Sequence, residues 1–406
     1  MSLDLGRVRA DFPALAQRVG GRPVVYLDNA CMTPKPEPVL RAMEDYYRGF
    51  PACHGRAAHR FGRLTTEAYD RARGTLASFI GAQDPTCVVF TRNATEGINL
   101  VARGSGLQAG DAVLCSEMEH NSNLLPWLDL RRRSGVQLRR FSLRADGSFD
   151  EAAFEKVLTS DVRLVSVFHT SNVTGASLPI PWIASRAHAI GALLLLDATQ
   201  AAACGPLDVA ALDVDLCVLS MHKAFGPTGT GLLWGRRGLL ETLSPLLYGG
   251  EMVADVDDEI FQLSPVPQRF EAGLQDYAGV LGAAAAATWL QACGLRAVPA
   301  HLAALNLAAS EGLSAIPGLR ILGPAEPARR HGIVNFILDG IPSEHVARVL
   351  DEGNNVMVRA GVHCSHGWYR ARGLPPSVRV SFALYNSIDE AGVLVRAVAG
   401  IARHFR

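Results

Sequence analysis

The fold is decided by the stretch Leu216-Cys-Val-Leu-Ser-Met-His-Lys-Ala-Phe-Gly-Pro-Thr-Gly-Thr-Gly-Leu232. Its apolar start, residues 216–219, predicts a short buried strand, and a turn rich in glycine and proline separates it from a second apolar run at residues 231–234. Lys223 lies where the first strand ends, close to Ser220 and His222. A lysine held near the core is a candidate for a lowered pKa and for Schiff-base chemistry. The stretch alone is equally consistent with a surface lysine in a hairpin, so the rest of the chain has to decide.

Apolar strands alternate with helices along much of the chain. Buried strands are predicted at residues 87–90, 112–115, 164–168, 192–196 and 213–219. Strands that are apolar along their whole length favour a mainly parallel sheet covered by helices on both faces. The pattern changes near Ala272 to Tyr277 and then becomes α+β. We predict an α/β fold with a large domain at 21–273, a smaller α+β domain at 274–406, and an N-terminal arm at 1–20 that packs with the small domain.

Polar side chains follow these strands where they end. Asp197 ends one strand, where a carboxylate is costly unless it meets a cation or strong donors. His120 follows another strand at the edge that faces the ligand crevice of an open α/β sheet, although a lone histidine there is more often structural. Thr95 lies at a predicted helix start, where free N–H groups favour an anion, and ordinary capping by Thr91 or Asn93 is the alternative.

One cofactor would use all of these groups. The strand ends supply Thr95, His120, Asn172, Asp197, Gln200, Ser220, His222 and Lys223. Pyridoxal 5'-phosphate (PLP) requires a carboxylate for its ring nitrogen, a lysine for covalent attachment and a cup for its phosphate. We expect Asp197 to keep the ring nitrogen protonated and His120 to stack on the ring. Ser220, His222 and Thr95 are expected to hold the phosphate.

Short motifs follow one another in a recognisable order. They are Tyr26-Leu-Asp-Asn-Ala30, Asn93-Ala-Thr-Glu-Gly97, Glu119-His-Asn-Ser-Asn123, Ser171-Asn-Val-Thr-Gly175, Asp197-Ala-Thr-Gln200, Ser220-Met-His-Lys223, Gly226-Pro-Thr-Gly229, Gly249-Gly-Glu-Met252, Arg269-Phe-Glu-Ala-Gly273, Arg359-Ala-Gly-Val-His-Cys364, Arg379-Val-Ser381 and Tyr385-Asn386. Single motifs of this kind are weak evidence, whereas the ordered series is strong. The series resembles the class V aminotransferase group of fold-type I PLP enzymes, and most closely its cysteine desulfurases of the SufS/CsdA-like type.

The resemblance implies an enzyme that converts L-cysteine to L-alanine and carries the sulfur as a persulfide on Cys364. It implies Lys223, Cys364 and His120 as catalytic residues, and a metal is not implied. The implied cofactor-binding residues are Thr95, Glu96, His120, Asn172, Asp197, Gln200, Ser220, His222 and Lys223. The implied substrate-binding residues are Asn29, Ala30, Asn172, Arg359 and Arg379, where the planar fork of Arg379 suits a carboxylate. His363 and His366 are expected to lower the pKa of the Cys364 thiol, and a buried core thiol is the plainer alternative.

The chain departs from the family pattern in several places. Leu274 stands where the family has a threonine that reaches the neighbouring subunit's phosphate, and Ser365-His366-Gly367 replaces the usual residues after the cysteine. The loop of His54 and His59 aligns only loosely. Cys31 follows the Asn29-Ala30 pair, either as a tolerated small residue or as a second thiol of the active site. Another class V PLP enzyme (a C–S lyase, selenocysteine lyase, epimerase or aminotransferase) and a non-catalytic protein of the same fold remain as alternatives.

Composition restricts partners and location. Lys plus Arg and Asp plus Glu both number 39, so the zero formal net charge gives no electrostatic reason to expect nucleic acid or an anionic membrane. The alanine-rich run 283–287 is too short to span a bilayer, and no signal peptide opens the chain, so a cytoplasmic protein is expected. Eight cysteines without a CxxC pair argue against a disulfide framework. The resemblance also implies a homodimer and leaves room for a sulfur-acceptor protein.

Overall fold

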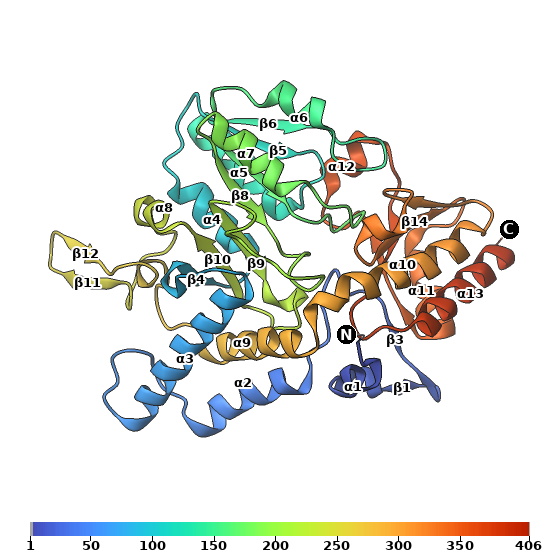
Figure 1. The fold of residues 1–406 in the computed structure, drawn as a ribbon, viewed down its shortest axis with the longest axis horizontal. Coiled ribbons are helices and arrows are strands. Elements are labelled where there is room, and N and C mark those ends of the chain that lie inside the picture. Colours follow the sequence, from blue (N-terminus) through green and yellow to red (C-terminus); the bar gives the residue numbers. More distant parts are fainter. Residues whose placement is uncertain (1–2, 406) are drawn as a thin grey trace.

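The computed structural model describes residues 3–405. Its largest sheet has the strand order β4-β10-β9-β8-β7-β5-β6 (Figure 1). The strands are β4 (Val88–Thr91), β5 (Ala112–Ser116), β6 (Gln137–Phe141), β7 (Val162–Phe168), β8 (Leu193–Asp197), β9 (Leu216–Ser220) and β10 (Gly231–Gly235). Only β10 pairs antiparallel with its neighbours, β4 and β9. The predicted mainly parallel mixed sheet is confirmed, and β9 begins at Leu216 rather than at residue 213.

Alternate residues of each strand belong to two different hydrophobic clusters. Along β5, Ala112 and Leu114 lie in one cluster and Val113 and Cys115 in the other. Such an arrangement requires cover on both faces, which explains why these strands are apolar throughout. Helices α4 (Ala94–Gly104) and α5 (Leu125–Ser134) supply one cover. The opposite cluster includes residues of α3 (Arg60–Phe79), α7 (Ile180–Ala189) and α9 (Tyr277–Ala292).

The remaining helices and strands lie outside the large sheet. The other helices are α1 (Leu5–Ala10), α2 (Glu37–Gly49), α6 (Glu151–Val157), α8 (Arg237–Thr242), α10 (Val298–Ser314), α11 (Ser343–Asn354), α12 (His366–Ala371) and α13 (Ile388–His404). The other strands are β1 (Arg18–Val19), β2 (Arg22–Pro23), β3 (Val25–Tyr26), β11 (Val253–Val256), β12 (Phe261–Leu263), β13 (Leu319–Leu322), β14 (Ile333–Leu338), β15 (Val356–Met357), β16 (Arg359–Gly361) and β17 (Ser377–Ser381).

The C-terminal part forms its own antiparallel sheet, β13-β14-β17-β16, with α10, α11 and α13 packed around it (Figure 1). The beginning of the chain contacts this part, because β3 pairs with β15 and Arg9 forms an ion pair with Glu390 at 2.8 Å. Helix α9 packs mainly against α2 and α3 of the large unit. The domain boundaries at 20/21 and 273/274 stay a prediction.

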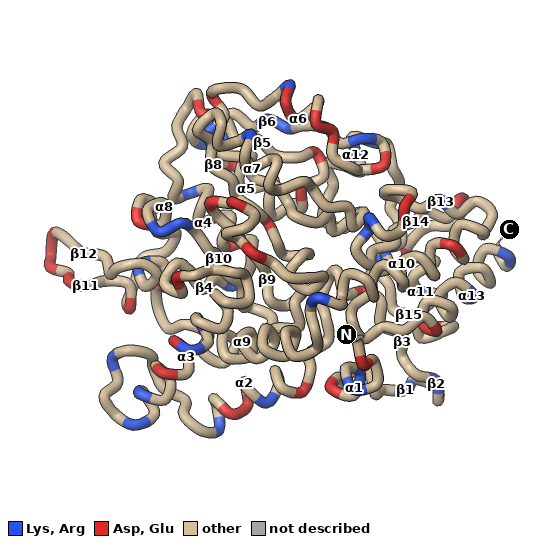
Figure 2. The backbone as a smooth tube through the Cα atoms, viewed as in Figure 1, with Lys and Arg blue, Asp and Glu red and all other residues tan. Residues whose placement is uncertain are grey.

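Charged residues of both signs are interspersed along the chain (Figure 2). An acidic group gathers where β11 turns into β12, at Asp255, Asp257, Asp258 and Glu259. Within residues 3–405, no single helix has the length and apolar character needed to cross a membrane. One pair of helices, Tyr277–Ala292 with Leu295–Ser314, has the required length and apolar character when the two are taken together, but the pair is bent by 65°.

Candidate active site

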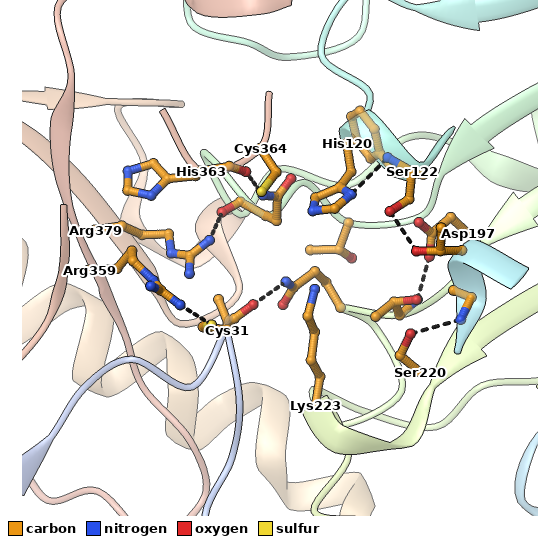
Figure 3. A pocket seen from close by; sticks show the side chains of 18 of the residues that line it. Cys31, His120, Ser122, Asp197, Ser220, Lys223, Arg359, His363, Cys364 and Arg379 are labelled. Atoms are coloured by element: carbon orange, nitrogen blue, oxygen red, sulfur yellow. Dashed lines mark hydrogen bonds between the residues drawn. The ribbon is translucent and has the colours of Figure 1, made fainter. Parts of the chain in front are cut away.

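Strand ends of the large sheet meet the C-terminal part of the chain around a cavity of about 490 Å³ (Figure 3). The predicted residues that line it are Ala30, Thr95, His120, Asn172, Asp197, Gln200, Ser220, His222, Lys223, Arg359, Cys364 and Arg379. The amine of Lys223 points into this space, around which His120, Cys31 and Cys364 also lie. The structure therefore brings together residues that are far apart in the sequence.

Two predicted residues are directed elsewhere. The Glu96 carboxylate turns away from this cavity, since it accepts from Arg92 N–H at 2.5 Å and pairs with Arg92 Nε at 3.2 Å. Asn29 is buried beneath the cavity wall, where its Nδ2 donates to Ser381 O at 2.7 Å and its Oδ1 accepts from the Tyr385 hydroxyl. Glu96 thus fixes the turn before α4, and Asn29 ties the loop after β3 to β17. Neither side chain lines this cavity, although Asn29 borders a smaller one that also reaches Lys223.

Lys223 is held by a tight turn after β9. Met221 N–H donates to Thr230 O at 3.0 Å, and Phe225, which has a positive φ of 63°, donates its N–H to Thr33 Oγ1 at 2.9 Å. Burial lowers the pKa of the Lys223 amine, and the charge of Asp197 opposes that shift. A lowered pKa raises the share of neutral amine, which is the form that attacks a carbonyl group.

Asp197 ends β8 opposite the lysine. Among residues 3–405, its carboxylate accepts one hydrogen bond, from Thr199 N–H to Oδ1 at 3.0 Å. The buried Thr199 hydroxyl has no hydrogen-bond partner in the same described part of the chain. Buried polar atoms without partners are rare in native proteins and indicate a missing ligand or water. A ring with a protonated nitrogen would satisfy this edge of the cavity.

His120 carries a neutral ring. Burial, followed by the charges of Lys223, Arg379 and His222, lowers the pKa of His120 to about 3. Its Nδ1 accepts a hydrogen bond from Ser122 N–H at 3.1 Å, so the proton of the neutral ring lies on Nε2. A flat, uncharged ring in this position can stack on an aromatic cofactor.

The start of α4 forms the opposite end of the cavity. Asn93 caps the helix by accepting from Glu96 N–H at 3.0 Å, and Ala94 N–H donates to Ser220 Oγ at 2.9 Å. Thr95 Oγ1 lies 2.7 Å from Ser122 Oγ. The capping alternative is therefore correct for Asn93, and Thr95 faces the cavity as well. Hydroxyl groups at the positive end of an eleven-residue helix fit a phosphate.

Two arginines of the C-terminal sheet share one aspartate. Arg379 Nη2 lies 3.3 Å from Asp28 Oδ1, and Arg359 Nε lies 3.3 Å from Asp28 Oδ2. Arg379 also donates to Asn172 O at 3.0 Å, whereas its buried Nε has no partner among residues 3–405. Two guanidinium groups and one carboxylate leave one positive charge. This arrangement is complementary to a single carboxylate of a ligand.

The loop 362–365 carries Cys364 to the cavity. His363 and Cys364 both have positive φ, 50° and 57°, a conformation that is strained for residues other than glycine. The loop is held in it because Asn172 Nδ2 donates to His363 O at 2.6 Å and Asn121 N–H donates to Cys364 O at 2.7 Å. The Cys364 thiol is exposed, which contradicts the alternative of a buried core thiol.

His363 does not act as predicted. Burial, then Arg379 and Arg359, lowers its pKa to about 2, and its Nε2 lies 3.1 Å from Ser377 Oγ. It is therefore neutral near pH 7 and brings no positive charge to Cys364. His366 contacts Asn121 Nδ2 through its Nδ1 at 3.0 Å. The expectation that His363 stabilises the thiolate by charge is wrong, because burial, followed by the two nearby guanidinium groups, lowers the pKa of its ring.

Residues 25–394 match the model of the family described as "Aminotransferase class-V". The chain belongs to this family. It is 41% identical over 99% of its length to "Probable cysteine desulfurase 2" of Mycobacterium leprae, 96% of which is covered. It is 36% identical over 98% of its length to "Cysteine desulfurase" of Haloferax volcanii, again with 96% coverage.

Solved structures give the same picture. The cysteine desulfurase CsdA (S-sulfonic acid) from Escherichia coli superposes with a TM-score of 0.91 at 32% identity, covering 100% of this chain and 99% of the other. An apo cysteine desulfurase from Thermococcus onnurineus NA1 gives a TM-score of 0.94, also at 32% identity and with the same coverage. PLP is the cofactor of this aminotransferase family, and the carboxylate, the lysine and the hydroxyl-lined helix start all fit it.

Sequence reasoning missed several polar residues in or directly behind the cavity wall. Asp28 orients both arginines, and Thr199 and Ser122 add polar groups around Asp197 and Thr95. Asp28 follows a short strand just as Asp197 does, so the rule for charged residues at strand ends could have found it. Thr199 and Ser122 carry no signal of their own, because hydroxyl residues are common in turns.

Arg379→Lys is expected to raise KM for the amino-acid substrate about 10- to 100-fold, since a lysine cannot reproduce a charge-assisted pair of hydrogen bonds. Lysine also cannot reach Asp28 and Asn172 together as Arg379 does. Steady-state kinetics measure the effect, while the absorbance of bound PLP reports an intact site. Arg370→Lys, on the exposed face of α12, is the matched control. An unchanged KM would show that Arg379 does not bind the carboxylate.

Three histidines that line the cavity, together with His169 beside it, make the fold sensitive to acid. Burial is the main cause that lowers the pKa of His120 to about 3, of His169 and His222 to about 4, and of His363 to about 2, from the usual 6.5. The unfolded chain therefore binds more protons than the folded one below pH 6.5, so stability falls as the pH falls.

The expected loss is about 1.4 kcal/mol per histidine for each pH unit below that point. Urea unfolding of the PLP-loaded protein at pH 7.5 and 5.5 measures it. His404→Gln, at an exposed helix end, should leave the pH dependence as it is. An unfolding midpoint that stays constant between the two pH values would refute the assignment of neutral buried histidines.

Proposed function

We propose that this chain is a PLP-dependent cysteine desulfurase that converts L-cysteine to L-alanine and takes up the sulfur as a persulfide on Cys364. One observation carries the proposal beyond the family. An exposed thiol, Cys364, opens into the same cavity as Lys223, on a loop whose carbonyl groups are held by Asn172 and Asn121. A C–S lyase that releases sulfide directly, or an aminotransferase, does not need a thiol at that position for its reaction.

The residues of the chain divide the work between them. When bound, PLP supplies an electron sink for negative charge on the carbon atoms next to the amino group. Lys223 Nζ, opposite Asp197, would hold the cofactor and take the proton from the substrate Cα. Arg379, supported by Asp28, binds the substrate carboxylate and so orients the thiol end toward Cys364. His120 holds its proton on Nε2 at the cavity wall.

The sulfur transfer needs no outside oxidant. The Cys364 thiolate attacks the substrate sulfur, a new S–S bond forms, and the bond between Cβ and sulfur breaks. The electron pair of that bond stays on Cβ, which takes up a proton to become the methyl group of alanine. The persulfide sulfur then leaves to an acceptor, which we propose to be a thiol of another protein, because the exposed Cys364 is accessible from solvent.

Incubation with L-cysteine tests the function directly. We expect alanine in solution and one additional sulfur atom on the peptide that contains Cys364, both measured by mass spectrometry. Cys53, which is exposed in the loop before α3, is an internal control for non-specific sulfur uptake. Pyruvate in place of alanine would refute the desulfurase and support a C–S lyase.

The homodimer and the cytoplasmic location belong to the same proposal. A second cavity of about 360 Å³ lies beyond β4 and is bordered by Leu247 and Leu274. Both leucines are exposed, and the exposed rings of Tyr248 and Phe261 pack together nearby with centroids 5.9 Å apart. A surface this apolar fits a second copy of the chain. Light scattering of the purified protein tests this, and a monomeric mass would refute it.

A further inference from the structure

A second thiol faces the active-site cavity. Among the cysteines, Cys31 and Cys364 are the two that line it. The backbone around Cys31 is fixed, since Cys31 N–H donates to Asp28 O at 3.1 Å and the Tyr26 hydroxyl donates to Met32 O at 2.8 Å. Ala30 N–H donates to Ser381 Oγ at 2.8 Å, which ties this loop to the small domain. The Cys31 side chain is therefore held toward the cavity.

The sulfur of Cys31 lies against a cation. The Arg359 guanidinium donates to Cys31 Sγ (Figure 3). It also contacts Asp28. Partly exposed thiols next to an arginine are the ones that react as nucleophiles. Arg359 begins β16, and the same strand leads after Gly361 into the loop of Cys364. The segment 359–364 therefore contributes both the arginine that contacts Cys31 and the thiol of Cys364.

Two further features of this cavity suit a ligand. Arg379, whose side chain is only 4% exposed, has an unpartnered Nε in the wall of this cavity, within residues 3–405. Both thiols line the same cavity as the amine of Lys223. The substrate sulfur is released in this space if the proposed function holds.

We propose that Cys31 is a second sulfur-accepting thiol, which takes the terminal sulfur from the persulfide of Cys364. The inference rests on the proposed desulfurase function. The Cys31 thiolate attacks the terminal sulfur of Cys364, a new S–S bond forms on Cys31, and the S–S bond on Cys364 breaks. The electron pair of the broken bond returns to Cys364 as a thiolate. One persulfide is lost and one is gained, so no oxidant or reductant is consumed.

The transfer explains why the two thiols differ in exposure. Cys364 is exposed, whereas Cys31 is only partly so and has Arg359 over its sulfur. A persulfide extends a cysteine by one S–S bond, about 2 Å, which brings the terminal sulfur of Cys364 further into the shared cavity. Sulfur on Cys31 is shielded from solvent, and Cys364 is free for another substrate. Each chain then stores two sulfur atoms before an acceptor arrives.

The test counts sulfur and alanine in the PLP-loaded protein without an acceptor. We expect an initial burst of about two alanine molecules per PLP-bound site, and about one in Cys31→Ser, since a burst reports the accumulated covalent product. Peptide mass spectrometry should find an added sulfur on Cys31 and on Cys364 but not on the exposed Cys53. In Cys364→Ser, the Cys31 peptide should stay unmodified, because its donor is missing.

The outcomes separate this inference from the proposed function. Alanine formed in a burst of one per site, with sulfur on Cys364 alone, would overturn the transfer to Cys31 and leave the desulfurase intact. Sulfur found equally on Cys31 and Cys53 would overturn it too, as would sulfur on Cys31 in Cys364→Ser. A failure to form any alanine would instead refute the proposed function itself. Cys53→Ser is the matched control and should retain the full burst.

Discussion

Replacing Lys223 by alanine is expected to lower alanine formation by about 10³-fold or more, because one side chain serves as the covalent anchor and as the base. The amine ends in the cavity opposite Asp197, and no other lysine lines that cavity among residues 3–405. The absorbance band of the lysine-bound cofactor should disappear with the activity. Turnover by the variant at a rate close to that of the parent protein would contradict both roles.

The lysine content of the chain makes this prediction unusually sharp. The sequence holds only Lys35, Lys156 and Lys223. Borohydride reduction of the loaded protein should therefore fix the cofactor to a single peptide, the one that contains Lys223. Lys156→Ala, on the exposed side of α6, is the matched control and should keep both the band and the activity. Label on the Lys35 peptide would show that the anchor has been assigned to the wrong residue.

Loss of the fold is not the expected cause of the Lys223→Ala phenotype. Burial lowers the pKa of this amine, which means that the folded state bears a cost for keeping it charged. Alanine removes that cost and leaves the turn hydrogen bonds of Met221 and Phe225, which are made by the backbone. The thermal midpoint of the variant without cofactor should therefore be equal to or above that of the parent protein without cofactor.

The sequence predicted the positions of site residues correctly where those residues come directly after a strand. The carboxyl ends of parallel strands meet at one edge of a sheet, so a residue that follows an apolar strand must lie at that edge. This rule placed His120, Asp197 and Lys223 around one cavity, and the structure agrees. It also covers Asp28, which was overlooked because the strand before it, β3, has only two residues and lies outside the large sheet.

Side-chain direction was beyond the reach of the same rule. Thr95 and Glu96 are neighbours in the first turn of α4, where consecutive residues point about 100° apart. Thr95 faces the cavity, and Glu96 turns back to Arg92. The charge of His363 was equally hidden, since it depends on burial and on guanidinium groups contributed by two different strands. Such properties arise from contacts that no local pattern encodes.

Replacing Cys364 by serine is expected to lower the rate of alanine release from L-cysteine by about 10³-fold, because a serine hydroxyl cannot take up the sulfur as a thiolate does. The loop itself should be preserved. Its hydrogen bonds from Asn172 and Asn121 go to the carbonyl groups of His363 and Cys364, and the exchange leaves both in place. Cofactor absorbance and its change on adding L-cysteine should therefore persist, which separates lost sulfur transfer from lost substrate binding.

The position of the thiol, and not merely its presence, decides the result. Cys53→Ser removes the other exposed thiol and should leave alanine formation at the level of the parent protein. The Cys364→Ser variant should still exchange the substrate Cα proton for deuterium in heavy water, because Lys223 and Arg379 act on the substrate before sulfur leaves. If that variant forms alanine as fast as the parent protein, the sulfur has another acceptor. The strained conformation at residues 363 and 364 would then serve some purpose other than presenting Cys364 to the cavity.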